Sequence, residues 1–88
     1  MLSVASFFKE NAEAIEIIAL DTSDLVNKPL RDIKFPRGAI IGAVVRDKEI
    51  IIPTGDTIIL PDDRVIIFTL TSVIPSVEKS LMVKMEYW

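Results

Sequence analysis

The sequence predicts an α+β domain in which a mixed or antiparallel sheet packs with two short helices. Its 88 residues are enough for one domain. Half of them are hydrophobic, with many isoleucines and valines, whose β-branched side chains favour strands. Short apolar runs alternate with clusters of turn residues, and helical spacing is confined to two places. We expect a β-hairpin followed by the order β-α-β-β-β-α.

The N-terminal part predicts the first hairpin. Leu2 to Phe8 and Glu13 to Leu20 are two strand-like segments that are separated by a short polar stretch. In the second segment, the two-residue period places Ile15, Ile17 and Ala19 on one face, which we expect to point into the core.

A turn and a short helix are predicted next. The side chains of Asp21 to Asp24 can bond to nearby backbone amides and so favour a turn. Pro29 suits the first position of a helix, and Pro36 must end that helix, which leaves about two turns. Leu30 and Ile33, three residues apart, would face the sheet together.

The middle of the chain predicts a second hairpin from Ala39 to Val45 and Glu49 to Ile52. Lys48 stands where a tight hairpin turn prefers glycine, so we expect this turn to be longer or strained. Gly38 fits a turn after Pro36. Gly42, inside a strand, indicates a bulge or the close approach of another backbone.

The C-terminal part predicts a turn, a strand and a helix. Pro53 to Asp56 reads as a turn in which Gly55 supplies the positive φ of a type II turn. Thr57 to Leu60 is a short extended piece, and Arg64 to Leu70 is the last clear strand. From Val73 to Met85 the apolar residues recur at helical spacing.

The composition argues against several classes of function. Histidine and cysteine are absent, which removes the usual metal ligands, the thiolate nucleophile and the usual base for a serine nucleophile. We expect the acidic pair Asp62 and Asp63 to lie in a solvated turn. The net charge of −3 is dispersed and does not suggest nucleic-acid binding. No apolar run reaches the ~20 residues of a membrane span, so we expect a soluble chain. Because the usual catalytic side chains are missing, we expect no catalytic function.

Three arginines at strand ends are candidate binding groups, because a guanidinium can hold a carboxylate or a phosphate in a forked geometry. They are Arg37, Arg46 and Arg64. The alternative is that each is a surface arginine paired with an aspartate, the candidates being Asp32, Asp47 and Asp63. The aliphatic surplus likewise predicts either an interface or a well-filled core.

The run from Pro36 to Phe68, PRGAIIGAVVRDKEIIIPTGDTIILPDDRVIIF, resembles the C-terminal domain of TrkA-type potassium-uptake regulators, also called the C-terminal lobe of the RCK domain. The resemblance extends from Leu2 to about Leu81 and depends on the combined order of its short motifs. These are Pro36-Arg37-Gly38, Ile41-Gly42-Ala43, Ile52-Pro53, Gly55-Asp56-Thr57 and Asp63-Arg64-Val65. Lys48 and Asp62 depart from it, each where the family often has glycine.

The resemblance implies a non-enzymatic regulatory domain. The whole protein would lie in the cytoplasm, peripheral to the inner face of the cell membrane, and gate a membrane potassium transporter subunit in response to nucleotide. Family members carry a Rossmann lobe before this one, which would bind NAD or ATP. No GxGxxG motif occurs here, so we expect residues 1–88 to be a single domain that binds neither cofactor. It would be either a part excised from a longer chain with an upstream Rossmann lobe or a stand-alone copy.

The resemblance also implies a homodimer, since this lobe mediates dimer contacts and, in some relatives, binds cyclic di-AMP between two copies. The candidates for the dimer contact are Leu25, Val26, Ile40 and Ile41. The candidates for ligand binding are Arg46 and Arg64, together with Ile40 and Ile41.

Two other functions were weighed. A swapped-hairpin DNA-binding transcription regulator would also have short strands broken by turns, but it needs a basic face, which a charge of −3 disfavours. A small hydrolase needs a pair of carboxylates in a cleft, and no spacing in the sequence provides one.

Overall fold

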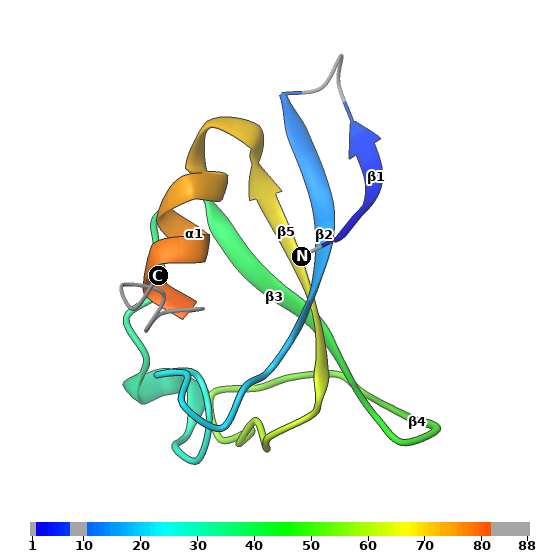
Figure 1. Ribbon diagram of the computed structural model, residues 1–88, viewed down its shortest axis with the longest axis vertical. Coiled ribbons are helices and arrows are strands. Elements are labelled where there is room, and N and C mark those ends of the chain that lie inside the picture. Colours follow the sequence, from blue (N-terminus) through cyan, green and yellow to red (C-terminus); the bar gives the residue numbers. More distant parts are fainter. Residues whose placement is uncertain (1, 8–10, 82–88) are drawn as a thin grey trace.

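A computed structural model describes residues 2–7 and 11–81 of the chain (Figure 1). It has the α+β class that the sequence predicts, with one five-stranded antiparallel sheet in the order β1-β2-β5-β3-β4. The strands are β1 (Leu2–Phe7), β2 (Ala12–Ile18), β3 (Ala39–Arg46), β4 (Glu49–Ile51) and β5 (Arg64–Leu70). The helical elements are two 3₁₀ turns, η1 (Leu30–Asp32) and η2 (Thr71–Val73), and the helix α1 (Ile74–Leu81).

Both predicted hairpins are present, and β5 joins them. β1 pairs with β2, and β3 pairs with β4. The last strand lies between β2 and β3, so that Ile67 is opposite Ile15 on one side and Ile41 on the other. Since every backbone group of a central strand can pair, β5 ties the two hairpins into one sheet.

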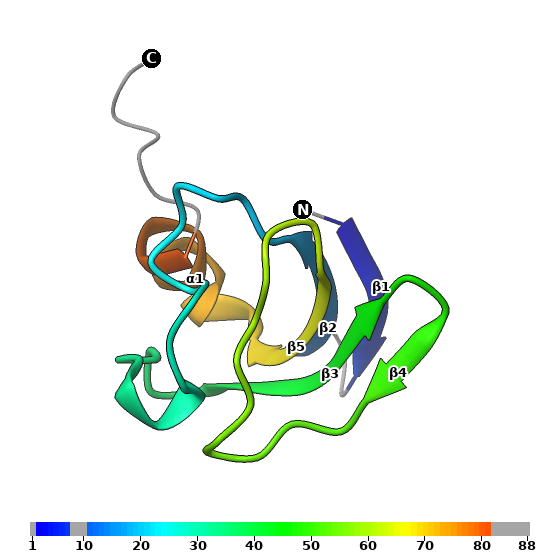
Figure 2. The same cartoon turned by 90° about the horizontal axis from the view of Figure 1, so that it is seen from below.

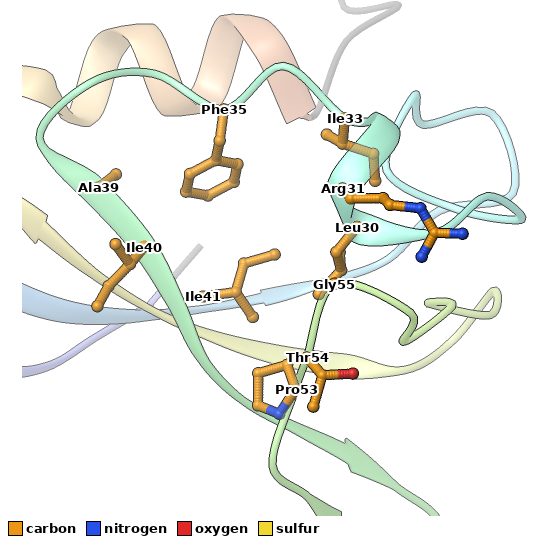
Figure 3. Close-up of a pocket in the computed structure, with 10 residues that line it drawn as sticks. All are labelled: Leu30, Arg31, Ile33, Phe35, Ala39, Ile40, Ile41, Pro53, Thr54 and Gly55. Atoms are coloured by element: carbon orange, nitrogen blue, oxygen red, sulfur yellow. The ribbon is translucent and has the colours of Figure 1, made fainter.

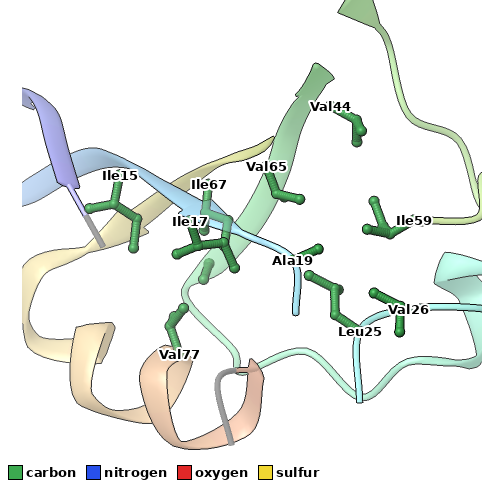
Figure 4. Packing of buried hydrophobic residues seen from close by; sticks show 11 residues of the cluster. Ile15, Ile17, Ala19, Leu25, Val26, Val44, Ile59, Val65, Ile67 and Val77 are labelled. Atoms are coloured by element: carbon green, nitrogen blue, oxygen red, sulfur yellow. The ribbon is translucent and has the colours of Figure 1, made fainter. Parts of the chain in front are cut away.

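The hydrophobic core lies on one face of the sheet (Figure 4). Ile15, Ile17 and Ala19 are buried, as the two-residue period predicts. α1 covers this face with the fully buried Val77 (Figures 2 and 4). The loops between strands add further buried side chains, namely Leu25, Val26 and Ile59. Each buried aliphatic side chain of this size contributes about 1.5–3 kcal/mol, so the loops are part of the core.

The predicted two-turn helix after Pro29 is wrong: only the 3₁₀ turn η1 forms there. Pro29 and Ile33 flank it in extended conformation. The backbone N–H of Leu30 donates to the carbonyl of Thr57 (2.9 Å), and that of Arg31 donates to the carbonyl of Gly55 (3.0 Å). The segment thus satisfies its backbone by pairing with a distant loop, which replaces the local helical bonds.

The bulge predicted at Gly42 is confirmed, whereas the close neighbour there is a side chain and not another backbone. The register between β3 and β5 shifts between Ile41 and Ala43, which is a bulge. A Cβ added at Gly42 would lie 2.2 Å from Cε2 of Phe68. The ring of Phe68 therefore occupies the space that any other residue at this position would need.

The hairpin turn between β3 and β4 is tight, because Arg46 pairs directly with Glu49. The strain expected from Lys48 falls instead on Asp47, which has a φ of 56°. Aspartate is one of the few residues besides glycine that adopt the left-handed region readily. The turn is therefore strained, as expected, but not longer.

In the two later turns, the positive φ is found at an aspartate and not at the glycine for which it was predicted. Gly55 does not have the positive φ of a type II turn, so that prediction is wrong. Its turn closes by the 3.1 Å bond from the N–H of Thr57 to the carbonyl of Thr54. Asp62 does have a positive φ, 76°, and follows Pro61 in a turn that closes from Asp63 to Leu60 (3.1 Å).

The C-terminal helix was predicted from Val73 to Met85. The structure has η2 over Thr71–Val73 and α1 over Ile74–Leu81, and the remainder of the prediction lies outside the described residues. The residues that link β1 to β2 in the first hairpin lie partly outside them as well.

Candidate functional site

An apolar groove opens beside β3, between the segment that precedes this strand and the loop that follows β4 (Figure 3). Its volume is about 380 Å³. The side chains of Phe35 and Ile41 point into it, and Ile40 lies at one side (Figure 3). The other residues that line it are Leu30, Arg31, Ile33, Ala39, Pro53, Thr54 and Gly55. Such a groove suits a ligand with flat apolar parts.

The walls of the groove are fixed by backbone contacts. The two bonds from Leu30 and Arg31 to the loop hold η1 against residues 53–57. Within the loop, Oγ1 of Thr57 accepts from the N–H of Thr54 (2.8 Å), and Oγ1 of Thr54 accepts from the N–H of Asp56 (3.2 Å). These contacts do not involve the charged side chains near the groove, so they define its shape independently of charge.

Among the residues that the structure describes, Arg31 is the one charged residue that lines the groove. Its Nη1 donates to Oδ1 of Asp56 in an ion pair that is exposed on both sides. The guanidinium points away from the centre of the groove, whereas the side chains of Phe35 and Ile41 point toward it (Figure 3). Nothing in the local sequence around Arg31 distinguishes it from other exposed arginines, so the sequence does not predict its place at the groove.

Arg46, a predicted ligand-binding residue, is bound to the protein itself. Its Nε donates to Oδ1 of Asp63 (3.0 Å), and its Nη2 donates to Oδ2 of Asp63 (2.8 Å) and to the carbonyl of Ile58 (3.0 Å). Oδ2 of Asp63 also accepts from the N–H of Leu60 (2.9 Å). Arg46 is therefore paired with an aspartate, which was the predicted alternative to ligand binding for the three arginines.

Asp63 is 2% exposed, so the prediction of a solvated turn is wrong for it, although its neighbour Asp62 is exposed. The hydrogen bonds from Arg46 lower the pKa of the Asp63 carboxyl, against the effect of burial, and the N–H of Leu60 lowers it further. The same pairing raises the pKa of Arg46. Both groups are therefore charged at neutral pH, and the pair is a structural contact.

The other two arginines lie apart from the groove. Arg64 is 3.5 Å from Glu16, measured from Nη1 to Oε2. Arg37 is exposed and lies at a separate shallow groove with Ser72 and Ser76. The structure thus brings Ile40 and Ile41 together at the groove, but it does not bring Arg46 or Arg64 to them.

The four predicted dimer residues divide into two groups. Leu25 is fully buried in the core and Val26 is 7% exposed, so within one chain they leave little surface for a second copy. Ile41 is partly buried at the groove. Ile40 is 64% exposed.

A second surface of note is the face of the sheet opposite the core, which we call the sheet face. Ile40 is directly opposite Phe68, and Ile18 is directly opposite Arg64. Directly paired residues, and residues two apart on a strand, share a face. The large apolar residues exposed there are Ile18, Ile40, Ile50, Phe68 and Leu70, each with between 43% and 69% of its surface exposed. So many exposed apolar side chains on one face are typical of an interface.

Two negative findings apply to the described segments. No group of three or more Asp or Glu residues in residues 2–7 and 11–81 is arranged to hold a metal ion. Over the same residues, no helix is long and apolar enough to cross a bilayer.

The family model of the TrkA-C domain matches residues 14–82. Among curated relatives, the "Trk system potassium uptake protein TrkA homolog 2" of Methanosarcina mazei is 52% identical over 77 residues, which are 88% of this chain and 17% of the relative. The "Trk system potassium uptake protein TrkA" of Azorhizobium caulinodans is 44% identical over 85 residues, 97% of this chain and 19% of the relative. The chain thus spans less than a fifth of the length of these two relatives.

A solved structure described as "Structure of RCK domain with cda" is similar in fold. The TM-score is 0.67 at 28% sequence identity, and the match covers 77% of this chain and 96% of the other.

Proposed function

The chain belongs to the TrkA-C domain family, and from this membership we propose that it is a non-catalytic regulatory domain of a potassium-uptake system. The observation that carries the proposal is the apolar groove beside β3, whose rim residue Ile40 also belongs to the sheet face. A ligand in the groove and a partner on the sheet face would therefore contact the same side chain. This continuity would let ligand binding change an interface, as a regulatory domain requires.

We propose that the domain acts within a longer protein. The two Trk potassium-uptake proteins described above are about five to six times as long as the matched segment. In this proposal an upstream Rossmann lobe binds NAD or ATP, and the whole protein gates a membrane potassium transporter subunit from the cytoplasmic side of the membrane. The domain described here supplies the ligand response and the dimer contact.

The ligand proposed for the groove is cyclic di-AMP. Apolar side chains such as Phe35, Ile41 and Pro53 offer surfaces for nucleobases, and the lining includes one cation, Arg31, near enough to serve a phosphate. The likeness to an RCK domain described "with cda" supports a small ligand for this fold. The roles predicted for Arg46 and Arg64 stay predictions, and both guanidinium groups already have carboxylate partners.

The partner proposed for the sheet face is a second copy of this chain. Burying apolar surface contributes about 25 cal/mol per Å², and a two-fold contact uses the same patch twice and closes on itself. Because Ile40 belongs to both surfaces, a contact centred near Ile40 would bring two grooves close together. One cyclic dinucleotide could then contact both copies.

Light scattering over a concentration series tests the dimer. We expect the wild-type chain to associate, more strongly with cyclic di-AMP, and the variant Ile40→Lys to remain monomeric. Leu20→Lys is the matched control, since Leu20 is also an exposed apolar residue but lies outside the sheet. A wild-type chain that stays monomeric at high micromolar concentration, and that cyclic di-AMP neither associates nor stabilises against heat, would remove the support for this proposal.

In the full-length protein, potassium uptake provides the functional test. Ile40→Lys should make uptake insensitive to the ligand, because it alters the side chain shared by the groove and the sheet face. Unchanged ligand-sensitive uptake in that variant would contradict the regulatory role of this surface.

A further inference from the structure

The ion pair between Arg31 and Asp56 stands at the edge of the groove, and it is the feature from which we draw an inference about regulation of this site. We propose that Arg31 is the phosphate-binding side chain of the groove and that Asp56 is its competing counter-ion, which the ligand displaces. This inference rests on the proposed function, because it presumes that an anionic ligand occupies the groove.

The charges around the groove support this assignment. Within residues 2–7 and 11–81, Arg31 is the one charged residue in the lining, and the remaining lining is apolar except for Thr54. A dianionic dinucleotide that buries its bases against apolar side chains still needs a cation for its phosphates, since an unpaired charge in a poorly hydrated groove is costly. The planar guanidinium of Arg31 can bind a phosphate with two parallel hydrogen bonds.

The geometry shows why the guanidinium of Arg31 is available to a ligand phosphate. The side chains of Arg31 and Asp56 are 58% and 85% exposed, and exposed ion pairs contribute little to stability because solvent screens them. The guanidinium now points away from the groove centre (Figure 3). A ligand phosphate therefore has only a weak contact to break, and the long side chain can then turn toward the groove.

Asp56 has a second effect on the ligand. The loop fixes its backbone, since its N–H donates to Oγ1 of Thr54 (3.2 Å), and its carboxylate is paired with Arg31 at the edge of the groove. A carboxylate in this place repels the ligand phosphate and competes with it for Arg31. Asp56 should thus set the ligand concentration at which the domain responds.

The pair can be removed without altering the groove. The N–H of Arg31 bonds to the carbonyl of Gly55, and the N–H of Leu30 bonds to the carbonyl of Thr57. These backbone contacts remain when either charged side chain is replaced. Changes in affinity can then be assigned to charge, once an unchanged melting temperature shows that the variant is folded.

The test is calorimetric titration of the 88-residue chain with cyclic di-AMP at two salt concentrations. Asp56→Asn should tighten binding about two- to fivefold, and Arg31→Gln should weaken it about tenfold or more and reduce its salt dependence. In the Arg31→Gln background, Asp56→Asn should tighten binding less than it does in the wild-type chain, because the competition is gone and only the repulsion of the ligand phosphate is removed. The matched control is Asp24→Asn, which makes the same charge change away from the groove.

The outcomes separate the two proposals. If the wild-type chain binds cyclic di-AMP but Asp56→Asn and Arg31→Gln bind like the Asp24→Asn control, the role of this pair is overturned and the ligand assignment stands. If neither the wild-type chain nor Asp56→Asn binds, the ligand assignment fails and this inference fails with it. The dimer measurement without ligand is independent of both results, whereas its cyclic di-AMP arm depends on the ligand assignment.

Discussion

Arg46 and Asp63 join β3 to the beginning of β5 through two parallel hydrogen bonds, of 3.0 and 2.8 Å, between the guanidinium and the carboxylate. The same arginine holds the carbonyl of Ile58, and the same carboxylate holds the N–H of Leu60. One ion pair thus fixes the loop that precedes β5. Because this loop carries the buried Ile59, the pair also supports the core.

Replacing Asp63 should therefore destabilise the domain. Asp63→Asn leaves the guanidinium of Arg46 without its anion, and we expect a loss of about 2 kcal/mol in the free energy of unfolding at pH 7. Urea denaturation measures it, with Asp24→Asn as a control at an exposed aspartate. Equal midpoints for the two variants would mean that the pair contributes no more than a surface charge.

The same pair predicts sensitivity to acid. The carboxyl of Asp63 has a lower pKa in the folded chain than in the unfolded chain, so its contribution is complete above the unfolded value of about 4. That contribution is lost as the pH falls through the lower folded pKa. Denaturation curves between about pH 7 and 3 should show a steeper loss of stability for the wild-type chain than for Asp63→Asn. Parallel losses would contradict the assignment.

A glycine at position 62 should stabilise the domain. Asp62 has a φ of 76°, which costs a residue with a Cβ roughly 1 kcal/mol or more, partly offset by the extra freedom of glycine in the unfolded chain. We expect Asp62→Gly to gain up to about 1 kcal/mol and Asp62→Ala to lose stability, since alanine lacks the local bonds that aspartate can make. Thermal melts of the two variants compare them directly, and an alanine variant as stable as the glycine variant would count against the argument.

A side chain at position 42 should be tolerated only if Phe68 is replaced by a smaller residue. The Cβ of Gly42→Ala would lie 2.2 Å from Cε2 and 2.6 Å from Cδ2 of Phe68, and displacing the ring should cost about 1–3 kcal/mol. In a Phe68→Leu background the same substitution should cost clearly less. Additive effects in this double-mutant cycle would show that the ring moves away freely.

The 88-residue chain should bind neither NAD nor ATP appreciably. It has no glycine-rich turn between a strand and a helix to hold a pyrophosphate, and the loop at residues 53–57 is followed by an extended segment instead of a helix. Calorimetric titration with each nucleotide checks this. Saturable binding in the micromolar range would place the nucleotide site in this lobe.

The sequence by itself determined the fold class, both hairpins, the core face of β2 and the bulge at Gly42. Each follows from local information: alternation of side chains along a strand, residues that favour turns, or the missing Cβ of glycine. The same information located the loop at residues 53–57, but it did not show what the loop would contact. Ile40 and Ile41 were predicted as interface candidates because they are aliphatic residues of the hairpin region, without a view of the groove between them and this loop.

Tertiary structure alone decided the rest, because those features depend on residues that are distant in sequence. β5 lies between β2 and β3. In the loop that precedes β5, the carboxylate of Asp63 binds the guanidinium of Arg46, so Asp63 is buried while the adjacent Asp62 is exposed. The segment after Pro29 pairs with the carbonyls of Gly55 and Thr57 in place of forming a helix. That pairing brings Arg31 beside Asp56, twenty-five positions away, a proximity that no local period in the sequence could have indicated.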